Sequence, residues 1–146
     1  LHAIASGDTS VVRNRDAPTV LTPHDGEFEQ LTGGRPGADR LAAARALAAT
    51  HRCTVLLKGP ATVVADETGA ALVVDHGDER LATAGTGDVL AGMIGALLAA
   101  GMAPLRAAAA AAWLHADAAH RGPAAGLVAS DLPELLPSVL EGLTDG

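Results

Sequence analysis

The feature that most restricts the fold of this 146-residue chain is a continuous apolar run of strand length, residues 53–58 (CTVLLK). A strand without polar alternation is covered on both faces, as in the interior of an α/β sheet. The run follows a helical pattern at 39–50, where apolar residues recur every three or four positions. Strands alternating with helices predict an α/β fold, with helices on both faces of a mostly parallel sheet.

The remaining elements follow from apolar spacing and turn residues. The other predicted strands are 18–21, 62–65 and 71–74, the last two forming a hairpin around DETG. The other predicted helices are 25–31, 88–100, 104–120 and 131–140, and residues 1–5 are expected to end an earlier helix. Pro137 is expected to disturb the last helix, because proline removes a backbone donor.

Charge and composition exclude several classes of protein. A net charge of −7 argues against nucleic-acid binding, which needs a basic surface. The longest apolar stretch, 107–114, is too short to span a bilayer, and no signal peptide is recognisable. The single cysteine, Cys53, is expected to be a buried, inert thiol in a reducing compartment. These features predict a cytoplasmic protein without membrane partners.

Residues 84–88 (AGTGD) directly precede an apolar helix and carry the clearest chemical signal. Glycines allow backbone N–H groups to converge, and a helix N-terminus adds about half a positive charge. Such an anion hole stabilises the charge that grows on a phosphate during transfer. Asp88 is a candidate base towards a nearby hydroxyl, although it could instead cap the helix. The Walker A pattern is absent, which excludes a P-loop protein.

The longer segment 81–92 (LATAGTGDVLAG) resembles the signature of the ribokinase-like family, which has a three-layer α/β/α fold. The resemblance implies that Gly85, Thr86 and Gly87 bind the transferring phosphate and that Asp88 is the catalytic residue.

A second segment, 21–27 (LTPHDGE), resembles the T-P-N-x-x-E motif with which sugar and vitamin kinases organise magnesium and phosphate. With histidine at position 24 it is more similar to the NAD(P)H-hydrate dehydratases, which return hydrated nicotinamide cofactors to NADH or NADPH. The resemblance implies that His24, with Asp88, contacts the hydrated dinucleotide and that Glu27 organises Mg²⁺ indirectly. Alternatively, His24 merely ends a strand in a polar turn. Asp25 stands where these dehydratases usually have proline.

A third segment, 55–62 (VLLKGPAT), resembles the K-G-x-x-T run that holds the adenine nucleotide in the same enzymes. The residues implied as nucleotide-binding are Lys58, Gly59, Pro60, Ala61 and Thr62, with Gly87 closing the same site. Lys58 is the only lysine of the chain, which supports a specific role for its compact ammonium.

Other polar residues receive weaker predictions. His51, His76 and His120 show no metal-site spacing and are expected at the surface, whereas Trp113 and His115 are expected to pack. Two interpretations stay open for the segment 78–80 (DER). Either its arginine approaches a phosphate, or the segment is an altered loop.

The resemblance covers residues 1–146 but only the later half of the family domain, so we expect a C-terminal part that lacks the N-terminal strands. The implied activity is an ADP-dependent NAD(P)H-hydrate dehydratase, a hydro-lyase that uses ADP or ATP with Mg²⁺ and forms a homo-oligomer. Two alternatives stay open: a hydroxymethylpyrimidine or sugar kinase of the same superfamily, and an inactive nucleotide-binding fragment. The residues do not distinguish ADP from ATP, nor do they show whether an epimerase domain is fused upstream.

Overall fold

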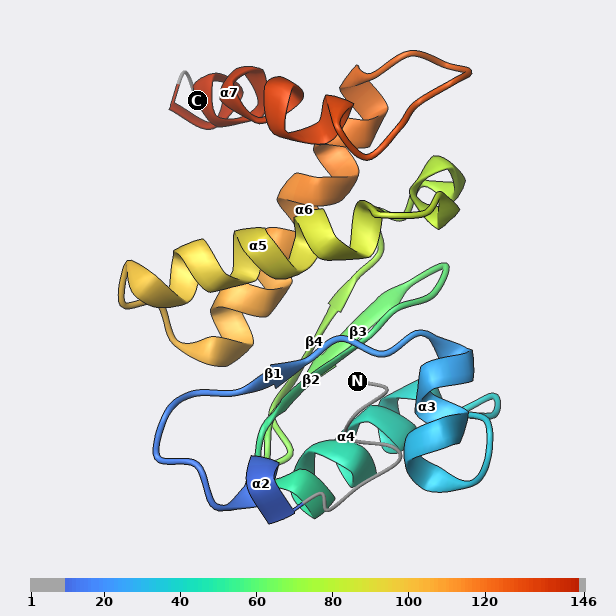
Figure 1. Ribbon diagram of the computed structural model, residues 1–146, viewed down its shortest axis with the longest axis vertical. Coiled ribbons are helices and arrows are strands. Elements are labelled where there is room, and N and C mark those ends of the chain that lie inside the picture. Colours follow the sequence, from blue (N-terminus) through green and yellow to red (C-terminus); the bar gives the residue numbers. More distant parts are fainter. Residues whose placement is uncertain (1–9, 145–146) are drawn as a thin grey trace.

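The computed structural model describes residues 10–144 and places four strands in one sheet with helices on both sides (Figure 1). The strands are β1 (Val20–Leu21), β2 (Thr54–Leu57), β3 (Thr62–Ala65) and β4 (Ala71–Val74). The helices are α2 (Ser10–Arg13), α3 (Asp25–Thr32), α4 (Arg40–His51), α5 (Thr86–Ala99), α6 (Pro104–Arg121) and α7 (Asp131–Thr144), with a 3-10 helix, η1, at Glu79–Ala82. The α/β prediction is confirmed, whereas the segment 1–5 lies outside the described residues.

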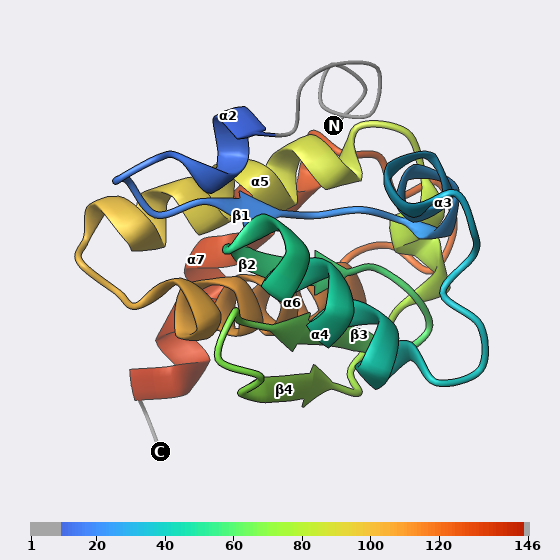
Figure 2. The ribbon, with the colours of Figure 1, turned by 90° about the horizontal axis from the view of Figure 1, so that it is seen from below.

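The sheet is mixed, with the strands in the order β1-β2-β3-β4 (Figure 2). β1 and β2 are parallel and are connected through α3 and α4, but β2–β3 and β3–β4 are antiparallel. The expectation of a mostly parallel sheet is therefore wrong for the described strands. A parallel connection needs about a dozen residues or more, and the turns 58–61 and 66–70 are too short for one.

The packing of β2 on both of its faces explains why its sequence shows no polar alternation. Val55 and Leu57 belong to a core cluster with residues of α3 and α4, whereas Leu56 packs on the other face with residues of α5 and α6. All three side chains are completely buried. Figure 1 shows the resulting layers, with α2, α3 and α4 on one side of the sheet and α5 and α6 on the other.

α7 runs through Pro137 to Thr144, past its predicted end. A proline inside a helix costs about 3 kcal/mol, because it removes one hydrogen bond and crowds the preceding turn. Leu132 and Val139, on either side of the proline, are completely buried in a cluster with α6 and Leu127. This tertiary packing holds the helix together where the local sequence predicts a disturbance.

Of two buried side chains near the start of β2, one agrees with its prediction and the other does not. Cys53 is buried, and burial raises the pKa of its thiol to about 11, so it is inert at neutral pH, as predicted. His51 is only 3% exposed at the end of α4, which contradicts its predicted surface position. Burial lowers the pKa of its imidazole, and the nearby Arg13 acts in the same direction.

Within residues 10–144, none of the helices has the length and apolar character needed to cross a bilayer.

Candidate active site

Residues of all three sequence motifs line a cavity of about 1130 Å³ at one edge of the sheet. Because β1 and β2 are parallel, the segments that follow them leave the sheet at the same edge. The N-terminus of α5 meets them there. The predicted site residues that line the cavity are His24, Lys58, Gly59, Pro60, Thr62, Gly85, Thr86, Gly87 and Asp88. Ala61 and Glu27 are not among the lining residues, although Glu27 contacts Lys58.

His24 is the N-cap of α3. Its Nδ1 accepts hydrogen bonds from the amides of Gly26 at 3.1 Å and Glu27 at 3.2 Å. The Glu27 carboxylate in turn accepts from the His24 amide at 2.9 Å, which completes a capping box. With Nδ1 acting as an acceptor, the proton of the neutral ring sits on Nε2, and the side chain is 59% exposed. His24 therefore shapes this turn, and its exposed Nε2, which lies 3.5 Å from Glu27 Oε2, can still donate to a ligand.

Lys58 joins the other two motifs. Its Nζ lies 3.4 Å from Glu27 Oε2, and a Cβ added to Gly87 would lie 3.5 Å from the same Nζ. Burial opposes ionisation of Glu27, but the His24 amide and the Lys58 ammonium outweigh it and hold the pKa of this carboxyl below its usual value. An ammonium, an ionised carboxylate and the start of α5 are thus brought together.

The glycine-rich turn is locked from inside by Thr86. The Thr86 hydroxyl is buried within hydrogen-bond distance of two carbonyls, those of Leu81 at 2.6 Å and Thr83 at 2.8 Å. Gly85 adopts a left-handed conformation, with φ of 90°, and caps α5 without a side chain. Among the described residues, the amides of Gly85 and Gly87 donate to no other group. They are therefore free to bind an anion at the helix N-terminus.

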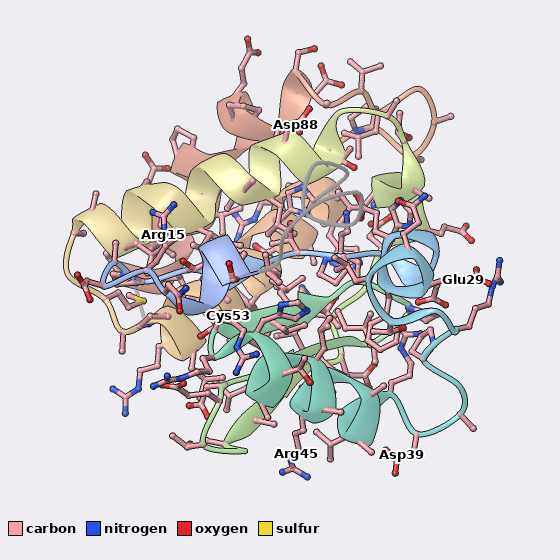
Figure 3. The ribbon with its side chains drawn as sticks, turned by 60° about the horizontal axis from the view of Figure 1, so that its bottom comes forward. Arg15, Glu29, Asp39, Arg45, Cys53 and Asp88 are labelled. Atoms are coloured by element: carbon pink, nitrogen blue, oxygen red, sulfur yellow. The ribbon has the colours of Figure 1, made fainter. Side chains whose placement is uncertain are left out.

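Asp88 lies in the first turn of α5 and is exposed (Figure 3). Gly85 occupies the N-cap position, and the Asp88 carboxylate has no hydrogen bond or ion pair with any residue between 10 and 144. The interpretation of Asp88 as a helix cap is therefore wrong. Its exposed carboxylate belongs to the cavity lining, together with Gly85 and Gly87.

Arg40 of α4 is a further site residue, which the sequence motifs missed. Its Nη1 bonds Asp25 Oδ1 at 2.8 Å and its Nη2 donates to the Lys58 carbonyl at 2.7 Å. A Cβ added to Gly59 would lie only 2.5 Å from Nη2, so a larger residue at position 59 would push the Arg40 guanidinium out of this position. The signal in the sequence was Asp25, a charge in place of the usual proline. Arg40 thus ties the motif after β1 to the motif after β2.

Two residues near the cavity have structural roles. Arg80 bonds the Asp78 carboxylate and donates to the Pro123 carbonyl at 2.8 Å, which favours the altered-loop interpretation over phosphate contact. This guanidinium holds the pKa of Asp78 at about 2. His115 is 5% exposed, in keeping with its predicted packing role. Burial lowers the pKa of its ring, although a hydrogen bond with the Thr86 backbone opposes the shift.

A sequence profile described as NAD(P)H-hydrate dehydratase matches residues 2–140. The bifunctional NAD(P)H-hydrate repair enzyme Nnr of Mycobacterium leprae is 58% identical over 109 residues, which cover 75% of this chain and 23% of that protein. The ADP-dependent (S)-NAD(P)H-hydrate dehydratase of Cenarchaeum symbiosum is 41% identical over 128 residues, which cover 84% of this chain and 44% of that protein. The chain thus spans less than half the length of these curated relatives.

A solved structure shows the same arrangement. The ADP/ATP-dependent NAD(P)H-hydrate dehydratase from Bacillus subtilis, co-crystallised with ATP and Mg²⁺, matches with a TM-score of 0.81 and 35% sequence identity. The match covers 88% of this chain and 49% of the Bacillus chain. Another solved structure, which matches with a TM-score of 0.69, is described as a ribokinase-like superfamily protein. The two matches together confirm the ribokinase-like character of the fold.

Proposed function

Because this chain belongs to the NAD(P)H-hydrate dehydratase family, we propose that it supplies the phosphate-binding and catalytic part of a hydro-lyase that returns hydrated NADH and NADPH to NADH and NADPH. The observation that carries the proposal is the position of the Lys58 ammonium, which lies beside both Glu27 and the start of α5. Three motifs that are far apart in the sequence thereby form one anion-binding edge.

The reaction joins phosphoryl transfer to elimination. Hydroxide is a poor leaving group, whereas phosphate is a good one. Asp88 takes the proton of the ring hydroxyl, and the hydroxyl oxygen bonds to the terminal phosphoryl group as the bond to the nucleotide breaks. The ring carbon then releases phosphate with the bonding electron pair, and the neighbouring carbon loses a proton to water, which restores the double bond. The free amides of Gly85 and Gly87 stabilise the charge on the transferring group.

The adenine nucleotide is proposed to bind along residues 58–62, where Lys58 acts as a point charge on its phosphates. ADP is the donor proposed, with ATP as the alternative, because relatives are named ADP-dependent or ADP/ATP-dependent. Glu27 fits an indirect role towards Mg²⁺. Its Oε2 is held by Lys58 and the His24 amide, and its Oε1 has no partner among the described residues. Bound Mg²⁺ supplies charge neutralisation on the phosphates.

His24 is proposed to contact the substrate through its Nε2 donor. An asparagine would cap α3 equally well, so the cap itself does not separate a dehydratase from a kinase of the same fold. An asparagine would also keep its Nδ2 donors, but the imidazole presents its Nε2 donor farther from the backbone. The names of the relatives favour the dehydratase. A cytoplasmic location is in keeping with the unpaired Cys53, and self-association remains a prediction.

The decisive experiment supplies hydrated NADH, ADP or ATP, and Mg²⁺, and follows the absorbance of the reduced ring. It uses the chain alone and a chimera in which the chain replaces the matching part of the Bacillus subtilis relative. We expect turnover in the chimera. Phosphorylation of a pyrimidine or sugar alcohol without dehydration would identify a kinase instead. Nucleotide binding by the chain, without turnover by either protein, would select the inactive module.

Asp88→Asn separates catalysis from folding in the same assay. Asparagine keeps the size and polarity of the side chain but cannot accept the proton as a carboxylate does, and general-base help contributes about 10²–10⁴-fold in rate. We expect turnover to fall at least about a hundredfold with nearly unchanged thermal stability and nucleotide affinity. Asp16→Asn is the matched control, because this exposed side chain has no hydrogen bond or ion pair with the described residues. Full turnover in Asp88→Asn would place the base elsewhere.

A further inference from the structure

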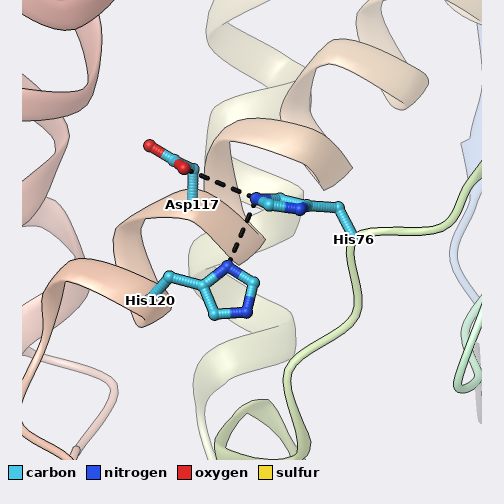
Figure 4. A group of neighbouring side chains, drawn as sticks. All are labelled: His76, Asp117 and His120. Carbon is cyan, nitrogen blue, oxygen red and sulfur yellow. Dashed lines mark hydrogen bonds and ion pairs between the residues drawn. The ribbon is translucent and has the colours of Figure 1, made fainter.

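Three side chains outside the proposed catalytic machinery converge at the rim of the cavity. His76 follows β4, whereas Asp117 and His120 are three positions apart on one face of α6 (Figure 4). His76 Nε2 lies 3.2 Å from His120 Nδ1 and 3.4 Å from Asp117 Oδ1. The fold thus brings together groups that are more than forty positions apart in sequence.

The spacing of these three atoms suits a bound cation. In a tetrahedral site, ligand atoms about 2.0–2.1 Å from the metal lie about 3.3 Å from one another. Two of the observed distances are 3.2 and 3.4 Å, and all three ligand atoms lie within 4.8 Å of one another. His76 Nε2 carries at most one proton but faces two possible acceptors. A metal ion at the centre would satisfy all three lone pairs at once.

Each ligand side chain is also held from outside. Asp117 accepts a hydrogen bond from Arg121 Nε at 2.9 Å through Oδ2, which leaves Oδ1 facing the cluster. His120 Nε2 lies 3.4 Å from the Asp78 carboxylate, so its proton is favoured on Nε2 and its lone pair on Nδ1. Carboxylate partners of this kind orient metal-binding histidines.

The His76 ring is held by stacking. It lies on Trp113 with ring centroids 5.5 Å apart and an interplanar angle of 12°. This contact gives the half-exposed tryptophan a specific partner. All three candidate ligands are therefore oriented before any ion binds, which reduces the conformational entropy lost on binding.

We propose that His76, Asp117 and His120 form a binding site for a divalent transition metal of the Zn²⁺ class. Two imidazoles and one carboxylate suit Zn²⁺, whereas Mg²⁺ prefers oxygen ligands in an octahedron. The ion ties the segment after β4 to α6 and leaves a coordination position for water. His76 also lines the candidate active-site cavity, so the ion would sit at its rim. The sequence shows no metal-site spacing for these residues, because the candidate ligands come from two separate elements.

The test is a calorimetric titration of the purified, tag-free chain with Zn²⁺, together with the visible spectrum of the Co²⁺ form. We expect one Zn²⁺ per chain and a tetrahedral Co²⁺ spectrum. At a Zn²⁺ concentration of about a hundred times the dissociation constant, Tm should rise by roughly 5–10 °C. Mg²⁺ at the same concentration should do neither. None of these measurements needs nucleotide or turnover, so the outcome is independent of the proposed dehydratase activity.

Substitutions locate the ion. His76→Asn and His120→Asn should each weaken Zn²⁺ binding by more than about tenfold, because each removes a direct ligand. His24→Asn is the matched control. It removes a histidine from the cavity, retains a capping side chain and should leave Zn²⁺ affinity unchanged. The proposal is overturned if the parent chain binds no Zn²⁺ stoichiometrically, or if both cluster variants bind it as tightly as the parent.

Discussion

Replacement of Arg40 by alanine tests how strongly this side chain holds together the two motifs after β1 and β2. The guanidinium makes an ion pair with Asp25 at 2.8 Å and donates to the Lys58 carbonyl at 2.7 Å. The Arg40 side chain is 21% exposed and that of Asp25 is 45% exposed. Both contacts are partly buried, and solvent partly screens the ion pair.

The expected cost follows from these two contacts. A hydrogen bond from a charged donor contributes about 1.5–3 kcal/mol, and a partly exposed ion pair adds about 0.5–1 kcal/mol. Arg40→Ala should therefore lower the free energy of unfolding by about 2–4 kcal/mol. The entropy of unfolding is about 0.3 kcal/mol/K for 146 residues, so Tm should fall by about 7–13 °C.

Thermal unfolding followed by circular dichroism measures this effect. Arg45→Ala is the matched control on the same helix, because this exposed arginine makes one bond, to the Gly69 carbonyl in the turn between β3 and β4, and none to the two motifs. A second comparison uses Gly59→Ala, whose new Cβ would lie 2.5 Å from Arg40 Nη2. This substitution should cost stability in the parent and little in the Arg40→Ala background. Equal Tm values for Arg40→Ala and Arg45→Ala, or additive effects of Arg40→Ala and Gly59→Ala, would refute the clamp.

Two further predictions concern nucleotide affinity and pH. Lys58→Ala should weaken ADP or ATP binding by about ten- to a hundredfold. Arg106→Ala, outside the cavity lining, is the control and should leave the affinity unchanged. If calorimetry shows unchanged nucleotide affinity for Lys58→Ala, Lys58 is only a surface charge. Burial lowers the pKa of His51 and His115, so the unfolded chain takes up their protons first as the pH falls below about 6.5. Stability should then drop by up to about 1.4 kcal/mol per pH unit for each histidine until its folded-state pKa is passed. Urea unfolding at several pH values measures the slope, His51→Gln should reduce it, and a flat profile would contradict neutral buried rings.

The sequence by itself predicted most of the elements, because each depends on local properties. Strand β2 was recognisable from an unbroken apolar run, and the hairpin of β3 and β4 from the turn residues between them. The motif residues were also recognisable one segment at a time. Their meeting at one edge followed from the parallel pairing of β1 and β2, which places the ends of both strands together.

Only the tertiary structure decided which distant side chains meet. His51 is buried because the end of α4 packs against the core, although its local sequence resembles an exposed helix end. Arg40 reaches across eighteen positions to the Lys58 carbonyl, and His76 reaches across more than forty to Asp117. Periodicity and turn chemistry describe neighbours within a few residues of one another. Contacts between separate elements depend instead on how the helices are set against the sheet, and the Arg40 clamp and the histidine cluster arise from that packing.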